Sequence, residues 1–312
     1  MSIFDAIIQG IVQGLTEFLP VSSSGHLAIT QHVMGVTENN LFFNVMLHIG
    51  TLVAVVAFYY KLIWRLIKEF FAIVQDIFTG KFTFKNMNHD RNMIFMLIVG
   101  LLPLFLLFMP IPGTGMNVKD FADVISGGEQ YFIVVGISLL ATSILLTLGN
   151  IFNNRLIEKA KKDGTLGENG AGKQSLTVLD AIVVGLTQCC AAVFPGLSRS
   201  GSTLAAGQMR GVNRQTALDF TFIMAIPSIL AAAVLELSDA ISSPEGIGIS
   251  VGVIIAGMVA AAIVGYLSIV LFKWLLKTNK MYIFIIYTAI IGLAVIGVSI
   301  VELSLGYNIF VH

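Results

Sequence analysis

The side chains that could do chemistry in this sequence gather in two serine-rich turns. The first turn, Ser22-Ser23-Ser24-Gly25, lies between Glu17 and His26, and a second turn around Arg199 follows about 175 residues later. A carboxylate, an imidazole and a hydroxyl in one place suit transfer of a phosphoryl group to water. An arginine beside hydroxyls suits binding of a phosphate or diphosphate. These residue types therefore predict phosphoryl transfer, provided that the fold brings the two turns together.

The two turns belong to an imperfect internal repeat. The residues that match between the copies are Asp5, Gly10, Gln13, Pro20, Ser22, Ser24 and Gly25 in the first, and Asp180, Gly185, Gln188, Pro195, Ser198, Ser200 and Gly201 in the second. One inserted residue after the proline shifts the register. Glu17 and His26 occur only in the first copy, and Arg199 occurs only in the second. A duplicated scaffold has thus specialised its halves.

The composition indicates a polytopic membrane protein. Hydrophobic residues make up 56% of the 312 positions, charged residues make up 12%, and the mean hydropathy is +0.88. Such a chain is too apolar for a soluble domain. The formal net charge is zero and no basic patch is interleaved with aromatic residues, so we expect no nucleic-acid partner. The adjacent Cys189 and Cys190 cannot link distant segments and read as small packing residues.

The chain contains two kinds of hydrophobic segment. Because a bilayer core takes about 20 apolar residues in helical form, six segments qualify as transmembrane helices; they are 41–61, 92–111, 130–152, 216–236, 249–272 and 281–303. Segments 1–36 and 178–211 instead break at Pro20 and Pro195 into Ser/Gly-rich turns. Broken segments in matching places of two halves are typical of re-entrant hairpins that line a polar cavity.

The basic residues of the loops predict how the chain crosses the membrane. Loops 61–91, 153–177 and 273–280 are rich in Lys and Arg, whereas loop 112–129 carries only Lys119 and loop 237–248 carries none. Basic loops stay in the cytoplasm. Residues 1–152 then form a hairpin (1–36) that enters from outside plus three spans. Residues 178–312 form a hairpin (178–211) that enters from the cytoplasm plus three spans, and residues 153–177 link the halves.

The fold class expected from these assignments is an all-α polytopic membrane protein with an inverted-topology repeat, six transmembrane helices and two re-entrant helical hairpins. The segment 43–47 resembles 220–224, which supports the repeat beyond the hairpins. Loop 61–91 mixes aromatic and basic residues and is expected to hold an interfacial helix on the inner leaflet. The two hairpin tips are expected to meet near the middle of the membrane.

The tips are built to hold an anion. Glu17 lies four residues after Gln13 and so shares its helical face. Hydroxyl and backbone N–H groups at the start of a helix bind anions, helped by the helix dipole. An ionisable group at bilayer depth costs ~2.5–3.5 kcal/mol, so Glu17, His26 and Arg199 are not expected there by accident. The residues expected to bind substrate are Gln13, Ser22, Ser24, Gly25, Ser198, Ser200, Gly201, Ser202 and Thr203.

Two stretches carry a family resemblance. The run Gln13-x-x-x-Glu17 followed by Phe18-Leu19-Pro20-Val21-Ser22-Ser23-Ser24-Gly25-His26 resembles the first signature of the undecaprenyl-diphosphate phosphatase family, bacitracin-resistance type. The run Pro195-Gly196-Leu197-Ser198-Arg199-Ser200-Gly201-Ser202-Thr203 resembles its second. The match covers the chain in length and spacing. The family pattern allows Glu or Gln at the position of Gln13, so the glutamine here weakens any claim of two cooperating carboxylates.

The resemblance implies a function. The chain would be a hydrolase of the bacterial plasma membrane that converts undecaprenyl diphosphate to undecaprenyl phosphate and inorganic phosphate. The product is the lipid carrier recycled for peptidoglycan, and excess enzyme would give resistance to bacitracin by lowering the pool of diphosphate that the drug binds. The active site is expected to open to the outer, periplasmic side. A divalent cation, Mg or Ca, is expected as cofactor, and dimerisation stays open.

The catalytic roles are hypotheses. Arg199 with Ser198 and Thr203 would hold the diphosphate and stabilise the transition state. Either Ser23 or His26 would attack the terminal phosphorus. Glu17 would orient His26 or bind a metal, and His26 would act as base and then as acid.

Several alternatives stay open beside these roles. Glu17 and Arg199 could be a structural ion pair, and Ser22 and Ser24 could be helix caps. His48 reads as a packed polar residue within a span. The main rival function is a lipid-phosphate flippase or transporter, since inverted repeats with broken helices are the usual build of carriers. The other lipid phosphatase superfamily, which shares a Ser-Gly-His element, is disfavoured because its further arginine and histidine motifs are absent.

Overall fold

A computed structural model describes residues 1–312 except 36–40, 84–86, 128–130, 168–169, 243–248 and 311–312. Within the described ranges the chain is helical, with isolated bridges but no strands. In chain order the helices are α1 (Ile3–Phe18), α2 (Ser23–Val33), α3 (Leu41–Phe58), α4 (Tyr60–Phe78), α5 (His89–Leu101), the 3-10 helix η2 (Leu102–Phe108), α6 (Val118–Gly127), α7 (Tyr131–Lys162), α8 (Val178–Val193), α9 (Arg199–Met209), α10 (Arg214–Ser242), α11 (Val251–Lys277) and α12 (Tyr282–Leu305).

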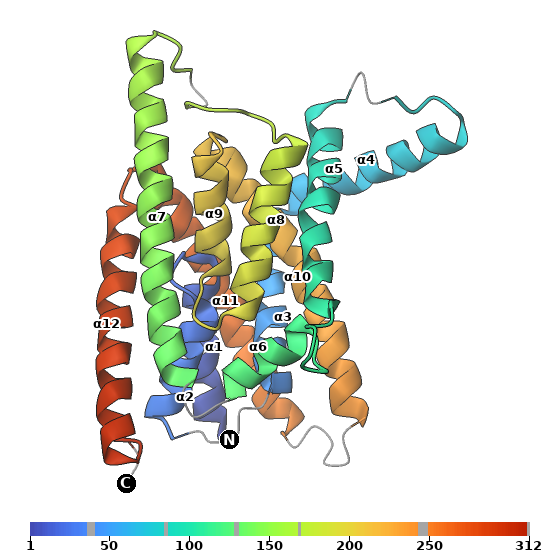
Figure 1. Cartoon of the computed structure of the whole chain (residues 1–312). Coiled ribbons are helices and arrows are strands. Elements are labelled where there is room, and N and C mark those ends of the chain that lie inside the picture. Colours follow the sequence, from blue (N-terminus) through green and yellow to red (C-terminus); the bar gives the residue numbers. More distant parts are fainter. Residues whose placement is uncertain (36–40, 84–86, 128–130, 168–169, 243–248, 311–312) are drawn as a thin grey trace.

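Five or six of these elements are long and apolar enough to cross a bilayer, which confirms the prediction of an all-α polytopic membrane protein. The five are α5 with η2, α7, α10, α11 and α12. The sixth is α3, which meets α4 at an 83° bend. Helix α4 leaves the bundle sideways (Figure 1) and exposes Trp64, Phe71 and Phe78. Its expected place on the inner leaflet stays a prediction.

Some elements depart from the boundaries expected from sequence. Helix α7 continues to Lys162, ten residues past the end of the expected span at 152. Polar and charged residues after 152 therefore extend a helix beyond the apolar stretch. Loop 112–129 contains the short helix α6, which hydropathy does not reveal because the helix is amphipathic rather than apolar. Residues 243–248 of the expected outer loop lie outside the described residues.

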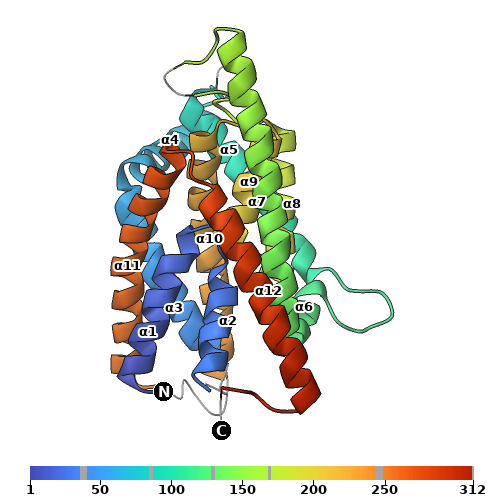
Figure 2. The same cartoon turned by 90° about the vertical axis from the view of Figure 1, so that its left-hand side faces the viewer.

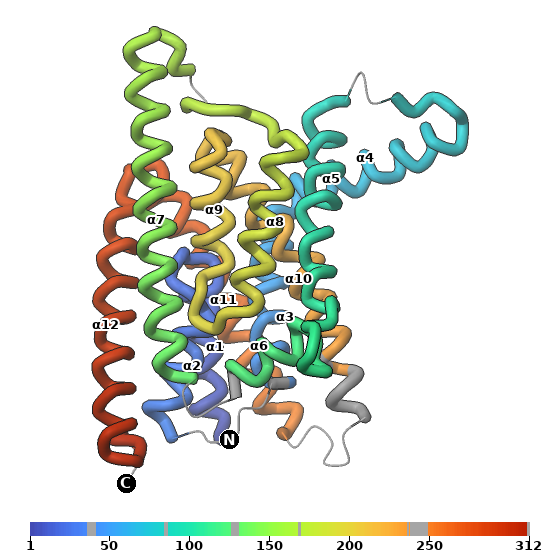
Figure 3. The backbone as a smooth tube through the Cα atoms, viewed as in Figure 1, coloured from blue at the N-terminus to red at the C-terminus, as the bar shows by residue number. Residues whose placement is uncertain are grey.

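Two short antiparallel hairpins lie inside the bundle. Helices α1 and α2 rise from the end that holds the N-terminus, whereas α8 and α9 descend from the opposite end (Figure 1), and both turns lie near the middle (Figure 3). Each first helix opens with a capping box, Ser2 with Asp5 in α1 and Thr177 with Asp180 in α8. Because 16 residues extend about 24 Å, neither helix spans a ~30 Å hydrocarbon core.

The two halves interlock through these hairpins. Helix α1 packs against α11 of the second half, and α8 packs against α5 of the first. Matching glycines make both crossings close: a Cβ on Gly10 would lie 2.4 Å from the carbonyl oxygen of Gly257, and one on Gly185 would lie 2.2 Å from that of Gly100. Figure 2 shows α1 and α2 between α11 and α12. Each half therefore holds the other half's hairpin in place.

Aromatic rings fill the space beside the first tip. Phe18, the last residue of α1, meets Phe222 of α10 edge to face at 5.3 Å, and Phe272 of α11 lies 6.1 Å from Phe222. All three side chains are buried. Such pairs add ~0.5–1.5 kcal/mol beyond their burial. The end of α1, and with it Glu17, is thus held by a packed core rather than by its turn alone.

Candidate active site between the hairpin tips

The two tips are capped in the same way. Ser22 Oγ accepts a hydrogen bond from the Gly25 N–H at 3.2 Å, and its counterpart Ser198 accepts from Gly201 at 3.0 Å. These serines are the N-caps of α2 and α9. Each cap uses a donor at the helix start that would otherwise lack a partner. Ser22 and Ser198 therefore have a structural role whatever else they do.

A second matched pair of serines joins the tips to each other. Ser24 Oγ accepts a hydrogen bond from the Gly196 N–H at 3.3 Å, and Ser200 Oγ donates to the Leu19 carbonyl at 3.1 Å. Gly196 has φ +88°, and a Cβ there would lie 2.7 Å from the Val135 carbonyl oxygen. Only glycine fits that position. The reciprocal bonds fix how the two turns face each other.

Strain is present at only one of the two caps. Ser22 has φ 74°, which non-glycine residues rarely adopt, whereas Ser198 has φ −64°. Such a conformation costs on the order of 1–3 kcal/mol and persists where the surroundings over-determine it. The Ser22 carbonyl accepts from both the backbone N–H and Nδ1 of His26, at 3.1 and 2.8 Å. These bonds hold the strained turn that presents Ser23.

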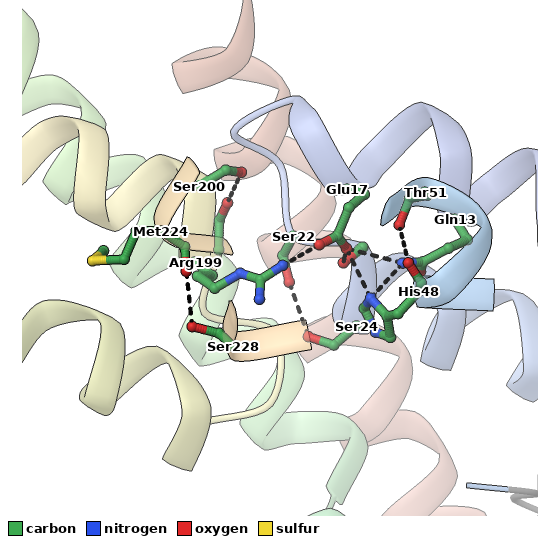
Figure 4. A network of polar contacts seen from close by, with 12 residues as sticks. Gln13, Glu17, Ser22, Ser24, His48, Thr51, Arg199, Ser200, Met224 and Ser228 are labelled. Atoms are coloured by element: carbon green, nitrogen blue, oxygen red, sulfur yellow. Dashed lines mark hydrogen bonds and ion pairs between the residues drawn. The ribbon is translucent and has the colours of Figure 1, made fainter. Parts of the chain in front are cut away.

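Glu17 is the centre of the polar network (Figure 4). One carboxylate oxygen accepts a hydrogen bond from Arg199. The other accepts from Gln13 Nε2 at 2.9 Å and from Ser23 Oγ at 2.6 Å, and it lies 3.2 Å from His48 Nδ1. The side chain of Glu17 is 2% exposed, so the carboxylate is held by protein groups instead of bulk water. Four residues from four helices, α1, α2, α3 and α9, converge on it.

A cavity of about 370 Å³ opens beside this network. Its polar wall comes from the tips, with Glu17, Ser23 and Arg199, and from His48 of α3; its outer wall comes from η2, α6 and the second half of α10. These outer elements lie toward the end of the bundle that holds the N-terminus, opposite the upper ends of α7 and α8 (Figure 1). The apolar part of the lining consists of Leu104, Leu107, Phe108, Ala122, Ala191, Ala192, Leu197, Ala231, Ala232 and Leu235.

The residues expected to take part in catalysis or to bind substrate divide into two groups. The residues that line the cavity are Glu17, Ser22, Ser23, Ser24, Ser198, Arg199 and Ser200. The residues that lie outside the lining are Gln13, Gly25, His26, Gly201, Ser202 and Thr203. Thr203 is buried and donates to the Arg199 carbonyl at 2.7 Å. It therefore supports the arginine's helix from behind instead of facing the cavity.

The expected contact between Glu17 and His26 is wrong. His26 Nδ1 donates to the Ser22 carbonyl at 2.8 Å, and Nε2 lies 2.7 Å from the Tyr287 hydroxyl of α12. Because the carbonyl can only accept, Nδ1 carries the proton and Nε2 accepts from the tyrosine. The two rings also stack at 5.5 Å. His26 is thus tied to α12, and the imidazole beside Glu17 is that of His48.

Comparison with known proteins identifies the family. The family model described as "Bacitracin resistance protein BacA" matches residues 6–294. The chain belongs to this family. Relatives named undecaprenyl-diphosphatase include one from Alkaliphilus metalliredigens, 38% identical over 92% of this chain and 95% of the relative. Others come from Methanosphaera stadtmanae, 36% identical over 93% and 95%, and from Bacteroides thetaiotaomicron, 35% identical over 93% and 96%.

Several residues that line the cavity of this BacA-family chain were not predicted from its sequence. His48, Gln188, Ser228, Lys119 and Asp123 all line the cavity. His48 lies within an apolar span, where a lone histidine reads as packing. Gln188 carried a signal, because it matches Gln13 in the repeat. Lys119 and Asp123 lie on α6, whose existence was itself not expected.

A divalent cation does not find a ready-made site between the tips. Among the described residues no three His, Cys, Asp or Glu side chains converge as metal ligands. Both oxygens of Glu17 already accept hydrogen bonds, and a guanidinium is one of the donors. Mg²⁺ and Ca²⁺ bind through oxygen ligands such as carboxylates, and both Glu17 oxygens are already engaged here. The arrangement therefore does not fit the expected metal role of Glu17.

Proposed function

We propose that this chain hydrolyses undecaprenyl diphosphate to undecaprenyl phosphate and inorganic phosphate. The observation that carries the proposal is the convergence of Ser23 and Arg199 on the single buried carboxylate of Glu17, at the wall of a cavity. A nucleophile beside its base and an anion-binding fork is what phosphoryl transfer needs. The relatives named undecaprenyl-diphosphatase support the choice of substrate.

The shape of the cavity supports an amphiphilic substrate. Hydroxyl, guanidinium and imidazole groups lie on its tip side, while Leu104, Leu107, Phe108 and Leu235 line its outer side. A diphosphate would lie against the tips, and the prenyl chain would follow the apolar wall into lipid. Because this wall comes from the elements away from the basic loops, the outer face of the plasma membrane is the side from which we propose that substrate enters.

The first chemical step uses Ser23 as nucleophile. Its Oγ donates to Glu17 at 2.6 Å, so the carboxylate is placed to accept the hydroxyl proton as Oγ attacks the terminal phosphorus. The bond from that phosphorus to the bridging oxygen breaks, and undecaprenyl phosphate leaves with the proton from Glu17. His26 is the weaker candidate for nucleophile, because both of its ring nitrogens already have protein partners and the residue lies outside the cavity lining.

The second step returns the enzyme to its starting state. Water attacks the phosphorus of phosphoserine and passes its proton through Glu17 to Ser23 Oγ, so that inorganic phosphate departs. Arg199 supports both steps. One of its five donors bonds Glu17, and the side chain is 26% exposed, so N–H groups that have no partner among the described residues can bond phosphate oxygens. The guanidinium would stabilise the charge that develops on the transferred group.

We propose that a divalent cation binds to the phosphates of the substrate rather than to a site formed by the protein alone. Magnesium commonly binds through substrate phosphates and one or two carboxylates, and it keeps several waters. Such an ion would enter on the diphosphate's own oxygens, and none of the steps above depends on it. Removal of undecaprenyl diphosphate by this reaction would also leave less of it for bacitracin to bind.

The test is release of inorganic phosphate from undecaprenyl diphosphate by purified protein in detergent. We expect release by the wild type and a loss of at least about a hundredfold in Glu17→Gln, because the amide cannot accept the serine proton. The rival flippase is tested in the same preparations by lipid scrambling in vesicles. Scrambling without phosphate release by the wild type would replace the hydrolase with a carrier.

A further inference from the structure

His48 is fixed on one side and open on the other. It lies on α3, and its Nδ1 is 2.8 Å from Gln13 Nε2 and 3.2 Å from Glu17 Oε2. Its Nε2 has no hydrogen-bond partner among the described residues. The side chain is 28% exposed and lines the cavity beside Glu17 (Figure 4). Whether His48 can donate a hydrogen bond into the cavity depends on whether Nε2 carries a proton.

The orientation of the Gln13 amide follows from its neighbours. Its Nε2 lies 2.9 Å from the Glu17 carboxylate, and its Oε1 is buried without a partner. Reversing the amide would place two oxygens, one of them ionised, 2.9 Å apart and would leave a buried carboxylate without that donor. Leaving Oε1 without a partner therefore costs less than reversing the amide, and Nε2 faces Glu17.

The orientation of the Gln13 amide determines which ring nitrogen of His48 carries the proton. An NH₂ group has two hydrogens, so Gln13 can donate one to Glu17 and one to His48 Nδ1. A neutral ring with its proton on Nδ1 would set two donors against each other at 2.8 Å. The neutral ring thus carries its proton on Nε2, and a charged imidazolium carries one there as well. In either state Nε2–H points away from Gln13 as an available donor.

We propose that His48 binds a phosphate oxygen of the diphosphate through Nε2–H, and that Gln13 holds the ring in the state that makes this possible. This inference rests on the proposed function of the cavity. The other ionisable side chains of its lining are Glu17, Arg199, Lys119 and Asp123. Arg199 approaches the carboxylate from the second tip and His48 from α3, so the diphosphate is held from two elements.

The second half has the same pairing without the imidazole. Gln188, which matches Gln13, donates from Nε2 to Ser228 Oγ of α10 at 3.2 Å, and its Oε1 is also buried without a partner. In each half the hairpin glutamine thus bonds the span that packs behind it. In the first half the partner of the glutamine is the imidazole of His48, and the Nε2 of that ring lies beyond the glutamine. This difference parallels the specialisation of the tips.

A pair of substitutions separates substrate binding from a purely structural role. Gln can place an N–H at about the position of histidine Nε2, whereas Asn can place its amide oxygen at about the position of Nδ1, where it accepts from Gln13. His48→Gln therefore keeps the donor in the cavity, and His48→Asn keeps the acceptor for Gln13. The measurements are KM and kcat for undecaprenyl diphosphate, and Kd for a prenyl methylenediphosphonate that cannot be hydrolysed.

We expect His48→Asn to raise both KM and Kd about ten- to hundredfold, as the loss of one hydrogen bond to a charged group predicts. His48→Gln should recover most of the affinity. The reverse order, or two variants that bind equally, would overturn the proposal, since a structural role requires the Nδ1 contact. A wild type that releases no phosphate would instead overturn the proposed function.

A measurement on the wild type covers the case in which a variant fails to fold. The chain has five histidines, so ¹⁵N-histidine labelling gives a small set of ring signals. Saturation with the methylenediphosphonate should shift one protonated Nε2 signal, and that signal is assigned by its absence from His48→Gln. An unchanged set of ring signals on saturation would contradict the proposed contact.

Discussion

Ser23 and Arg199 occupy equivalent positions in the two halves of the repeat, and both donate a hydrogen bond to Glu17. Their neighbours are identical serines with matched structural roles, Ser22 with Ser198 as caps and Ser24 with Ser200 as bonds between the tips. The repeat thus supplies one rigid frame twice. At the position between these serines, one copy carries the proposed nucleophile and the other a cation.

The first prediction concerns the guanidinium. Arg199→Lys should lower kcat by at least about 10³-fold, because lysine is a point charge that cannot bond Glu17 and a phosphate oxygen at once. Single-turnover phosphate release measures the chemical step. Arg214→Lys is the matched control, since Arg214 bonds α11 and Asn150 at the basic end of the bundle, outside the cavity lining. A lysine variant within tenfold of the wild type would contradict the role assigned to Arg199.

The second prediction concerns the nucleophile. Ser23→Ala should abolish turnover and any phosphoenzyme, because its hydroxyl is the one that bonds Glu17. Ser24→Ala should still form a phosphoenzyme, since Ser24 Oγ accepts a bond from the other tip instead. Acid quenching after mixing with terminally ³²P-labelled substrate, followed by peptide mapping, measures both. Label on a residue other than Ser23 would assign the nucleophile to that residue.

Sequence alone was sufficient for the local part of the site. The four-residue spacing of Gln13 and Glu17 predicts a shared helical face, and their side chains are in fact bonded at 2.9 Å. The two hydropathy breaks predict two turns, because a proline that ends a helix acts locally. These features depend on neighbours within about one helical turn. The direction of each crossing, inferred from the loop charges, stays a prediction.

The rest depends on contacts that no local pattern encodes. His26 lies next to the serine turn in sequence, yet the Ser22 carbonyl and Tyr287 engage its ring. His48 is 31 residues from Glu17 in sequence, and only the packing of α3 against the first hairpin brings the two together. Helix α6 is too short and too polar for a hydropathy signal, although it forms part of the cavity wall.

The third prediction uses the two capping boxes as a matched pair. Burial alone would raise the pKa of Asp180, but hydrogen bonds from Lys173, Thr177 and Arg210 outweigh it and lower the pKa from 3.8 to about 2. Among the described residues, the hydrogen bonds of the Asp5 side chain are those of the cap made with Ser2. Asp180→Asn should therefore lower the midpoint of thermal unfolding in detergent more than Asp5→Asn does.

The same pKa sets the direction of the acid dependence. A carboxylate with a lowered pKa stabilises the fold above the ordinary value of 3.8, and this stabilisation is lost as the pH falls toward 2. The difference in unfolding midpoint between wild type and Asp180→Asn should thus be full at pH 7 and shrink below about pH 4. A difference that is constant from pH 7 to pH 3 would show that the asparagine acts through packing and not through charge.

The fourth prediction concerns the crossing that holds the second hairpin. Gly185→Ala should prevent α8 from packing on α5, because the new Cβ would lie 2.2 Å from the backbone carbonyl oxygen of Gly100 and no side chain can move aside. Gly297→Ala on α12 is the control, since nothing lies within 4 Å of its Cβ position. Alanine in an open helical site stabilises by about 0.5–1 kcal/mol. The unfolding midpoint should fall in the first variant and hold or rise in the second. Phosphate release should fall with the first, because displacing α8 moves the turn that carries Arg199.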